Sequence, residues 1–503
     1  MKIHFIGVGG IGVSGLAGFY LSKGHKVSGS DLSDSPIIQA LKQQDAKIFI
    51  GTHNSKNLSN EVDLVVYTAA VEPDNPELQK AKKLGIKCQT YAQALGDLTK
   101  KMFTIAVSGM HGKSTTTAML ALVLEKAGLD PTVIVGTRLR EWGNRNFRVG
   151  KSKYLVIEAD EYNVSFLNYW PKIIVLTNIE EEHLDYYRDL KHIMATFKKY
   201  VSRLGKNGVL VANREDNNVR RLLNPKFEAH SRLRRTCSNP MRGTCSNPKQ
   251  IQNLKFKIQN YFLKQKEAGR LKKILKIPGE HNVSNALAVL MVARELKIPD
   301  KITFEALSEF RGTWRRMEYR GMVNDAKIYD DYGHHPTEIR ATLQGARELL
   351  GSSLLQREVR RDLKSKRFEN TKIHPTPPLQ KEGERLWCVF QPHQYQRTYK
   401  LFDQFVGAFG DADRLILLPI YSVAGREKVG VKKKVSSKML AKAIVKRNQE
   451  LGIRKQVLFI DPSLKAENYL KENLKKGDVC VIMGAGDIYK LTEMLFDKHH
   501  KNA

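Results

Sequence analysis

The chain has 503 residues and a formal net charge of +32, from 84 Lys and Arg against 52 Asp and Glu. Hydrophobic residues make up 41% and charged residues 27%, which is typical of folded globular proteins and excludes a chain that is disordered throughout. Five cysteines exclude a disulfide scaffold at this length, and no stretch approaches the roughly 18 consecutive apolar residues of a membrane-spanning helix, so we expect a cytoplasmic protein of about three domains.

The first 98 residues alternate apolar strand patterns with helical ones. A glycine-rich turn follows the first strand, and a helix is expected from about residue 11 to 23. This βαβ alternation predicts an α/β domain with a parallel sheet over residues 1–98. The strands are predicted at 2–6, 26–30 and 63–67.

Two further α/β patterns follow, and we place the domain boundaries near residues 98 and 312. The central domain, 99–312, is expected to contain a helix that begins near residue 281. Its strands are predicted at 103–107, 154–157, 173–177 and 208–212. Those of the C-terminal domain, 313–503, are predicted at 326–330, 386–390, 414–418, 457–460 and 479–483.

The turn after the first strand reads Gly-Val-Gly-Gly-Ile-Gly over residues 7–12. Glycines at Gly9, Gly10 and Gly12 let the backbone approach a diphosphate at the start of a helix. Asp31 ends the next strand, where an acid that binds a ribose would lie. The motif fits a dinucleotide or a UDP-sugar, so a nicotinamide-dependent oxidoreductase remains an alternative at this point.

A second phosphate-type loop spans residues 108–115, Ser-Gly-Met-His-Gly-Lys-Ser-Thr. The strict P-loop pattern fails because Val107 stands where its first glycine would be, but the shorter GxxGK[ST] pattern holds. In a strand–turn–helix setting, Lys113 is suited to the β- and γ-phosphates of a nucleotide and the Ser114 hydroxyl to Mg²⁺. Two such loops in successive domains indicate two different phosphorylated ligands.

Acidic groups follow two strands of the central domain. Glu158-Ala159-Asp160-Glu161 comes after one strand, and residues 177–185, which include His183, come after another. Sites in parallel sheets lie at the carboxyl ends of the strands, and carboxylates there can complete the coordination of Mg²⁺ around a nucleotide.

Two polar motifs follow strands of the C-terminal domain. Residues 329–338 read YDDYGHHPTE and residues 390–398 read FQPHQYQRT. Adjacent aspartates and histidines after a strand favour a functional site, and Arg397 is suited to bind a carboxylate or a transferring phosphoryl group.

Seven segments occur in the order found in Mur ligases: GVGGIGVSGLA, SGMHGKSTTT, EADEYNVSF, TNIEEEHLD, HNVSNALA, DDYGHHPTE and FQPHQYQRT. The chain resembles this family over nearly its full length. The resemblance implies a Rossmann-like N-terminal domain, a central P-loop-type ATPase domain with a mostly parallel sheet, and a Rossmann-like C-terminal domain. It also implies ATP and Mg²⁺ as cofactors and an ATP-dependent ligase activity in peptidoglycan precursor synthesis.

The last two segments and the opening glycine loop favour the branch that joins L-alanine to the carboxylate of UDP-N-acetylmuramate through an acyl phosphate. A Mur-type ligase that adds a peptide to the same sugar nucleotide is the alternative. The resemblance assigns ATP to Gly109, His111, Gly112, Lys113, Ser114, Thr115, Asn282, Asn285, Arg316 and Asp331. It assigns one metal ion to Ser114 and Glu158 and a second to His183. It assigns the substrates to Gly9, Gly10, Gly12, Asp31, His53, His334 and Arg397, with Lys113, Glu158, His183, His334 and Arg397 as the catalytic set.

One residue departs from the family pattern. Gln394 stands where the family usually has Arg, and a neutral amide does not supply the charge of a guanidinium. The departure concerns how this segment neutralises a phosphate or carboxylate.

The positive charge is concentrated in three windows, which together carry about +24 of the +32. Residues 228–276 and 351–386 are predicted to be insertions, the second a long loop, and residues 425–456 a basic amphipathic helix with Met439, Leu440, Ile444 and Val445 on its apolar side. We interpret the excess charge as a surface property and expect no specific nucleic-acid partner. The chain is expected to act as a monomer or a homodimer.

Overall fold

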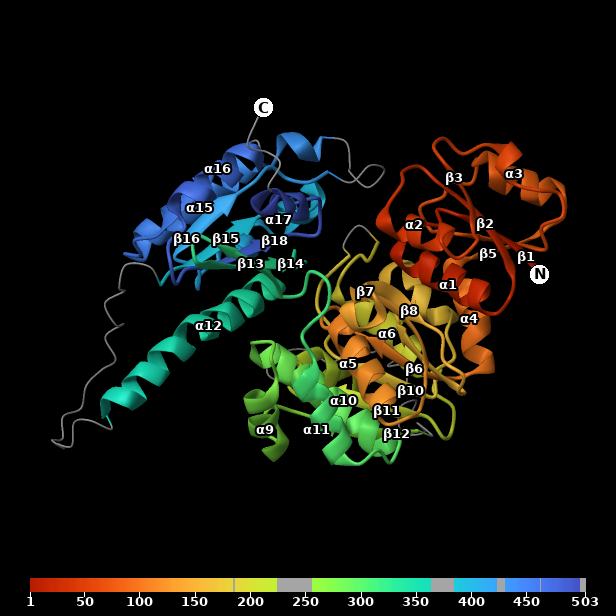
Figure 1. Cartoon of the computed structure of the whole chain (residues 1–503), viewed down its shortest axis with the longest axis horizontal. Coiled ribbons are helices and arrows are strands. Elements are labelled where there is room, and N and C mark those ends of the chain that lie inside the picture. Colours follow the sequence, from red (N-terminus) through yellow and green to blue (C-terminus); the bar gives the residue numbers. More distant parts are fainter. Residues whose placement is uncertain (184–185, 224–255, 363–383, 423–429, 462, 498–503) are drawn as a thin grey trace, which may run out of the picture. The chain divides into compact units, whose positions relative to one another are not determined.

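The computed structural model describes residues 1–183, 186–223, 256–362, 384–422, 430–461 and 463–497. It contains three sheets, each built mainly from parallel strands and flanked by helices (Figure 1). The chain divides into two compact units, residues 1–276 with 282–314, and residues 277–281 with the chain from 315 onward. The predicted α/β class is confirmed.

The first sheet has five parallel strands in the order β3-β2-β1-β4-β5. Ile3 and Phe5 of β1 lie in one apolar core, whereas Ile6 lies in a second core on the opposite face, as the alternation of side chains along a strand requires. The strands are β1 Lys2–Ile6, β2 Lys26–Asp31, β3 Lys47–Ile50, β4 Leu64–Tyr67 and β5 Lys87–Thr90. The helices are α1 Ile11–Ser22, α2 Pro36–Lys42, α3 Pro76–Lys83 and α4 Tyr91–Lys101, with a short 3₁₀ turn, η1, at Ser55–Asn57.

The second sheet has seven strands in the order β12-β11-β10-β6-β9-β7-β8, and only the β7–β8 pair within it is antiparallel. Its central strand β6 leads directly into the glycine loop and α5. The strands are β6 Phe103–Ser108, β7 Thr132–Leu139, β8 Arg145–Arg148, β9 Tyr154–Glu158, β10 Ile173–Leu176, β11 Val209–Asn213 and β12 Lys257–Tyr261. The helices are α5 Lys113–Lys126, α6 Leu190–Val201, α7 Asn217–Leu223, α9 Lys266–Ile274, α10 Glu280–Glu295 and α11 Asp300–Glu309.

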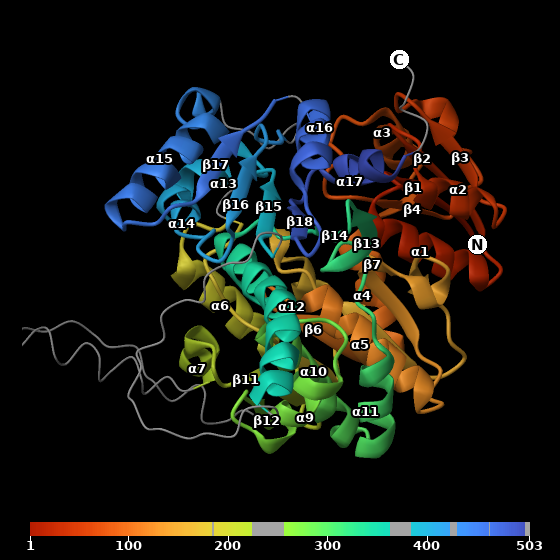
Figure 2. The same cartoon turned by 60° about the vertical axis from the view of Figure 1, so that its left-hand side comes forward.

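The third sheet has the order β13-β14-β18-β15-β16-β17, with β13 antiparallel to β14. Cys388 of β15 faces a core formed with α12, α14 and α15, and its neighbour Val389 faces one formed with α16 and α17. Helices therefore cover both faces of this sheet (Figure 2). The strands are β13 Glu318–Val323, β14 Ala326–Asp331, β15 Leu386–Phe390, β16 Arg414–Leu417, β17 Gln456–Phe459 and β18 Val479–Met483. The helices are α12 Pro336–Asp362, α13 Tyr395–Lys400, α14 Phe402–Val406, α15 Ser437–Glu450, α16 Ser463–Asn473 and α17 Tyr489–Phe496.

The two predicted insertions are shorter than expected where the structure describes them. Strand β12 and helix α9 fall inside the predicted insertion 228–276, and β12 pairs with β11 from Lys257 to Tyr261, so this part belongs to the sheet. The predicted loop 351–386 is helical at its start, because α12 continues to Asp362. Residues 224–255 and 363–383 lie outside the described residues.

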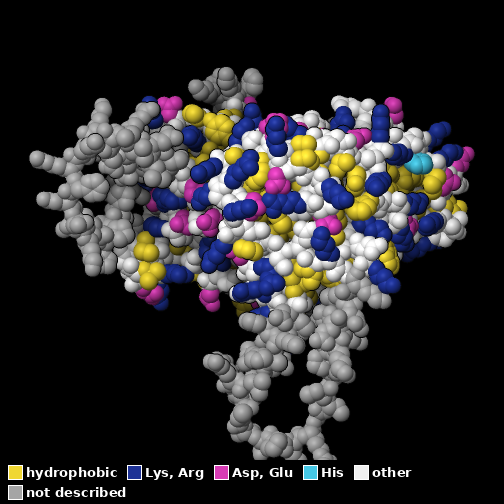
Figure 3. Space-filling view, turned by 90° about the horizontal axis from the view of Figure 1, so that it is seen from below, with side chains coloured by type: hydrophobic (Ala, Val, Ile, Leu, Met, Phe, Trp, Pro, Cys, Tyr) yellow, Lys and Arg dark blue, Asp and Glu magenta, His cyan; other side chains and the backbone are white. Residues whose placement is uncertain are grey.

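The predicted basic helix exists as α15, but its apolar side differs. Leu440, Ala441 and Ile444 are buried, whereas Met439 is 47% exposed, because a helix that packs on a sheet buries a stripe spaced by three or four residues. Lys and Arg side chains are spread over the face seen in Figure 3, among apolar and acidic ones. None of the helices that the structure describes has the length and apolarity needed to cross a membrane.

Candidate active site

The glycine loop between β6 and α5 has a backbone that needs glycine at two positions. Gly109 has φ +130°, and a Cβ there would lie 2.1 Å from Thr177 Oγ1. Gly112 has φ +82°, and a Cβ there would lie 2.6 Å from Asn285 Oδ1. Both φ values are ones that residues with a side chain rarely adopt, so the loop is held close to β10 and to α10.

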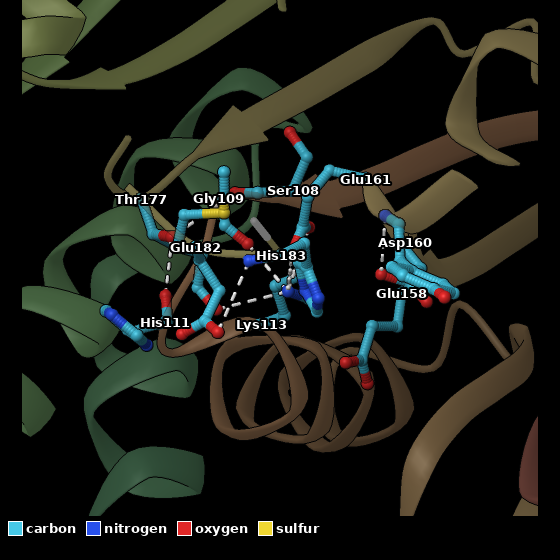
Figure 4. Close-up of polar contacts among 12 residues, drawn as sticks. Ser108, Gly109, His111, Lys113, Glu158, Asp160, Glu161, Thr177, Glu182 and His183 are labelled. Atoms are coloured by element: carbon cyan, nitrogen blue, oxygen red, sulfur yellow. Dashed lines mark hydrogen bonds and ion pairs between the residues drawn. The ribbon is translucent and has the colours of Figure 1, made fainter. Parts of the chain in front are cut away.

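Lys113, the first residue of α5, lies at the centre of this site (Figure 4). Its Nζ donates to the carbonyl oxygens of Gly109 at 2.7 Å and Met110 at 3.1 Å. The same atom lies 3.0 and 2.9 Å from the two carboxylate oxygens of Glu161, whose side chain is fully buried. The ammonium group is therefore fixed inside the curve of the glycine loop.

Lys113 and the neighbouring carboxylate of Glu161 stabilise each other in their charged forms. Burial lowers the pKa of Lys113, but the carboxylates of Glu161, Asp160 and Glu158 outweigh burial and raise that pKa above its ordinary value. Burial raises the pKa of Glu161, but Lys113 and His183 outweigh it and lower that pKa. The pair is therefore an ammonium and a carboxylate at neutral pH.

The three predicted metal ligands fall into two neighbouring groups. Ser114 Oγ donates to Glu158 Oε1 at 3.1 Å, and Glu158 Oε2 accepts from the Gly136 backbone N–H at 2.8 Å. His183 is instead hydrogen-bonded to Glu161, with 3.2 Å between His183 Nε2 and Glu161 Oε1. The possible metal-ligating atoms of Asp160, Glu161 and His183 all lie within 4.8 Å of one another.

His111 and Thr115 belong to the same loop and helix. The His111 backbone N–H donates to Asn178 Oδ1 at 2.9 Å, and its Nε2 lies 3.2 Å from Glu180 Oε2. Thr115 is buried on α5. The segment after β10 thus positions the loop after β6.

Asn282 and Asn285 lie in the first turns of α10 and are both buried. Asn285 Nδ2 donates to Asn282 Oδ1 at 3.5 Å, and the Asn285 amide packs against Gly112. Asn285 therefore lies beside the phosphate-type loop, and Asn282 is one contact further away.

In the first domain, Asp31 and Gly9 are joined by a hydrogen bond. The Gly9 backbone N–H donates to Asp31 Oδ2 at 2.8 Å, and a Cβ at Gly9 would lie 2.9 Å from the same atom. Gly12 packs against the ring of Tyr91. His53 follows β3, and its Nδ1 lies 3.1 Å from Ser30 Oγ. These residues lie at or after the carboxyl ends of β1, β2 and β3.

In the second compact unit, Asp331 ends β14 and is buried. Its Oδ1 accepts from the Gly333 N–H and its Oδ2 from the Met317 N–H, both at 2.8 Å. The Thr342 hydroxyl also donates to Oδ1, at 3.3 Å. Asp331 thus fixes the segments on both sides of its strand.

His334 and Arg397 lie near one another, with His393 between them. The rings of His334 and His393 have centroids 5.9 Å apart, and Arg397 Nη1 lies 3.0 Å from His393 Nδ1. The His393 ring stacks on Tyr421 with centroids 5.5 Å apart. Arg316 belongs to the same end of the unit, since its Nη1 lies 3.6 Å from an oxygen of Glu338, whose other oxygen accepts from the backbone N–H of His334.

Gln394 occupies an unusual backbone position at the start of α13. Its φ is +71°, its side chain is buried, and its backbone N–H donates to the Tyr421 carbonyl at 2.8 Å. The guanidinium that this segment offers is therefore that of Arg397.

Three residues that organise these sites do not stand out in the sequence as site residues. Glu161 pairs with Lys113, Glu338 accepts the backbone N–H groups of His334 and His335 at 2.9 and 3.2 Å, and Arg315 is buried with its Nε 3.3 Å from Asp330 Oδ1. Glu161 stood inside a recognised acidic motif, and Glu338, three residues into a helix, fits a capping signal. Nothing in the pattern separated Arg315 from the neighbouring Arg316.

A parallel sheet whose central strand runs into a glycine loop, with a lysine at the helix start and carboxylates at the ends of adjacent strands, defines an α/β nucleotide-binding enzyme. Three family profiles match the chain in sequence. They are described as Mur ligase family, catalytic domain, at residues 2–102; Mur ligase middle domain, at 107–293; and Mur ligase, glutamate ligase domain, at 315–356.

Relatives of similar length also match. A UDP-N-acetylmuramate–L-alanine ligase of Clostridium acetobutylicum is 40% identical over 502 residues, covering 99% of this chain and 98% of the relative. One from Clostridium botulinum is 41% identical over 497 residues, covering 98% and 96%. The crystal structure of a UDP-N-acetylmuramate–alanine ligase from Thermotoga maritima matches with a TM-score of 0.70 at 25% identity and covers 98% of both chains.

The chain belongs to the Mur ligase family, whose members use ATP to form an amide bond. The match extends over all three sheets, so the expected three-domain α/β architecture is confirmed. The family assignment also removes the basis for the nicotinamide-dependent alternative, because both glycine loops are accounted for within one ligase.

Proposed function

We propose that this chain joins L-alanine to the carboxylate of UDP-N-acetylmuramate, with ATP converted to ADP and phosphate, in peptidoglycan precursor synthesis. The observation that carries the proposal is the full-length identity of 40–41% to ligases of that name. The cluster of Lys113 and Glu161 around the glycine loop supports the ATP-dependent chemistry.

ATP is expected to bind the central domain at the loop 108–112. Backbone N–H groups at the start of α5 face the phosphates, and the ammonium group of Lys113 offsets the charge of the β- and γ-phosphates. Asn285, which is buried next to Gly112, and Asn282, which is bonded to Asn285, are suited to the adenine side of the nucleotide. Because the chemistry of phosphoryl transfer depends mainly on position and charge, a fixed lysine is the central requirement.

The residues around Lys113 also fit Mg²⁺. Ser114 Oγ, Glu158 and Asp160 offer oxygen atoms, the ligands that Mg²⁺ prefers, and His183 lies beside Glu161. We infer that Ser114 and Glu158 hold one ion and that the group of Asp160, Glu161 and His183 contributes to a second. Bound Mg²⁺ would neutralise the phosphate oxygens of ATP.

The sugar nucleotide is expected at the glycine loop of the first domain. The backbone around Gly9 and Gly10, at the start of α1, is suited to the diphosphate. Asp31 is held by the Gly9 N–H, and His53 stands at the neighbouring strand end. In the C-terminal unit, His334 and Arg397 are suited to L-alanine, since a guanidinium binds a carboxylate in a planar, bidentate manner.

The reaction has two steps. A carboxylate oxygen of UDP-N-acetylmuramate attacks the γ-phosphorus, a new P–O bond forms, and ADP leaves with the bridging oxygen. The neutral amine of L-alanine then attacks the carbonyl carbon of the acyl phosphate and gives up a proton. The C–O bond to phosphate breaks, so the amide forms and phosphate leaves with one oxygen of the original carboxylate.

The test is an omission assay of phosphate release. The full-length chain should release phosphate only when ATP, Mg²⁺, UDP-N-acetylmuramate and L-alanine are all present. Replacing L-alanine by a tripeptide distinguishes the peptide-adding alternative. Phosphate release without a sugar nucleotide would contradict the proposal. Phosphate release that occurs with the tripeptide but not with L-alanine would also contradict it.

A further inference from the structure

The first domain contains a second polar cluster, on the face of its sheet opposite to α1. Its centre is Glu77, in the first turn of α3, and both Glu77 and His4 of β1 have side chains that are 0% exposed. A carboxylate buried this completely persists only where hydrogen bonds replace its hydration.

The two carboxylate oxygens of Glu77 form hydrogen bonds with different parts of the domain. Oε2 accepts from Ser30 Oγ at 2.7 Å and lies 2.8 Å from His4 Nε2. Oε1 lies 3.1 Å from His53 Nδ1 and accepts from Asn57 Nδ2 at 2.9 Å. One carboxylate therefore joins the interior of the sheet to the segment 53–57 that follows β3.

The charge of Glu77 is stable in this setting. Burial raises its pKa, but the hydrogen bonds from His4, Ser30 and Asn57 outweigh burial and lower the pKa to about 2. Its place at the N-terminus of α3 also favours a negative charge. Glu77 is thus a fixed anion that accepts hydrogen bonds and donates none.

The cluster is connected to the glycine loop through one residue. The hydroxyl of Ser30 bonds Glu77, and its backbone carbonyl accepts from the N–H groups of Gly7 at 2.8 Å and Val8 at 3.1 Å. The next residue, Asp31, accepts from Gly9. The same strand end thus carries the contact to Glu77 and the contacts to the loop.

The two histidines of the cluster differ in what they offer a ligand. His4 uses both ring nitrogens inside the domain, since its Nδ1 lies 2.9 Å from Ser28 Oγ. His53 turns its Nδ1 edge toward Glu77 and remains 17% exposed. A proton on Nδ1 that is bonded to the carboxylate fixes the ring orientation and the tautomer, so the opposite Nε2 edge meets a ligand in one defined form.

We propose that Glu77 is a positioning residue for the sugar nucleotide, and that it acts by orienting His53 beside Ser30, whose backbone carbonyl holds the glycine loop. The inference rests on the proposed function, because it takes UDP-N-acetylmuramate as the ligand of the first domain. Glu77 itself, at 0% exposure, touches no ligand.

A double-mutant cycle on binding tests the proposal. Affinity for UDP-N-acetylmuramate is measured by calorimetry for the full-length chain, Glu77→Gln, His53→Gln and the double variant, with Glu61→Gln as control because Glu61 is a 73% exposed carboxylate of the same domain. We expect Glu77→Gln to weaken the binding of UDP-N-acetylmuramate about tenfold. In the His53→Gln background, the same substitution should not weaken binding any further. Losses that multiply independently, or no loss at all, would overturn the proposal.

A spectroscopic measurement separates positioning from a loss of fold. In wild-type protein above pH 8, where an ordinary imidazole is neutral, ¹⁵N shifts should show His53 protonated at Nδ1. A glutamine amide both donates and accepts, so Glu77→Gln should mix the two tautomers. A wild-type His53 protonated at Nε2 overturns the inference, and wild-type protein that binds no sugar nucleotide contradicts the proposed function instead.

Discussion

Lys113 Nζ lies 3.0 and 2.9 Å from the two carboxylate oxygens of Glu161. The pair links the start of α5 to the segment after β9, so the glycine loop and the acidic strand end form one unit. A lysine at the end of a flexible side chain is thereby held where the phosphates of ATP are expected to bind.

The first prediction separates the catalytic role of Lys113 from its structural one. Lys113→Met should lower kcat/KM at least about 100-fold, because the phosphates lose a fixed positive charge. It should also destabilise the protein by about 3–5 kcal/mol, because the buried charge of Glu161 loses its partner. Phosphate release and urea unfolding measure the two effects.

A double variant provides the control for that experiment. Lys113→Met with Glu161→Gln removes both charges, so it should recover much of the lost stability while activity stays low. Recovery of activity together with stability would show that Lys113 acts only through the fold.

The second prediction concerns Mg²⁺. Asp160→Asn should raise the Mg²⁺ concentration needed for half-maximal activity about tenfold, because a neutral amide is a weaker ligand for a hard cation. The matched control is Glu181→Gln, an exposed acid two residues before His183. Equal Mg²⁺ curves for wild type and Asp160→Asn would exclude Asp160 from the metal site.

The third prediction concerns the guanidinium of Arg397. Arg397→Lys should lower kcat/KM for L-alanine about 10- to 100-fold, because an ammonium group does not reproduce a planar, bidentate contact. Lys400→Arg, exposed on the same helix, should be unchanged.

Gln394→Ala extends that comparison to the residue that departs from the family pattern. Its side chain is buried and its backbone bonds Tyr421, so the variant should affect stability more than the KM for L-alanine. A larger loss of alanine affinity in Gln394→Ala than in Arg397→Lys would contradict this assignment.

Most of the strands that sequence patterns predicted lie inside the sheets, and β17 is an exception at a sheet edge. β15, with the sequence LWCVF, and β18, with VCVIM, are continuous apolar runs, and such runs are typical of strands buried on both faces. The missed strands lie at edges or beside them. β12, with the sequence KIQNY, is a sheet edge, and it pairs with residues of β11 that lie 48 positions earlier in the chain.

The fourth prediction concerns Asp331. Because both its oxygens accept backbone N–H groups, Asp331→Asn should destabilise the protein by about 1.5–3 kcal/mol. Urea unfolding measures the change, and Asp403→Asn, an exposed aspartate of the same unit, is the control. Unchanged stability together with weaker ATP binding would instead favour direct contact with the nucleotide.

The fifth prediction follows from the pKa of Glu77, about 2 against an ordinary value of 4.5. A carboxyl group whose pKa is lower in the folded than in the unfolded protein stabilises the fold at pH values above its unfolded-state pKa. This stabilisation is lost as the pH falls from the unfolded-state pKa toward the folded-state pKa. The difference in unfolding free energy between wild type and Glu77→Gln should therefore be constant above pH 5 and shrink below pH 4.5. A difference that grows on acidification would contradict the ionised state.

The site was predictable in its parts and less so in its connections. Lys113 and Ser114 stand out as candidates because their motif has a fixed spacing, and Glu158 because it ends an apolar strand. The Lys113–Glu161 pair does not, because the two residues are 48 positions apart and meet only when β6 and β9 lie side by side. For the same reason, the sequence did not predict that His183, expected at a second metal ion, is hydrogen-bonded to Glu161.

The most direct test of the account follows one oxygen atom through the reaction. UDP-N-acetylmuramate labelled with ¹⁸O in its carboxylate is incubated with the chain, ATP, Mg²⁺ and L-alanine, and the products are analysed by mass spectrometry. The proposed reaction through an acyl phosphate predicts an alanine adduct of the sugar nucleotide and one ¹⁸O in each phosphate released. Phosphate without the label, or no product that depends on L-alanine, would contradict it.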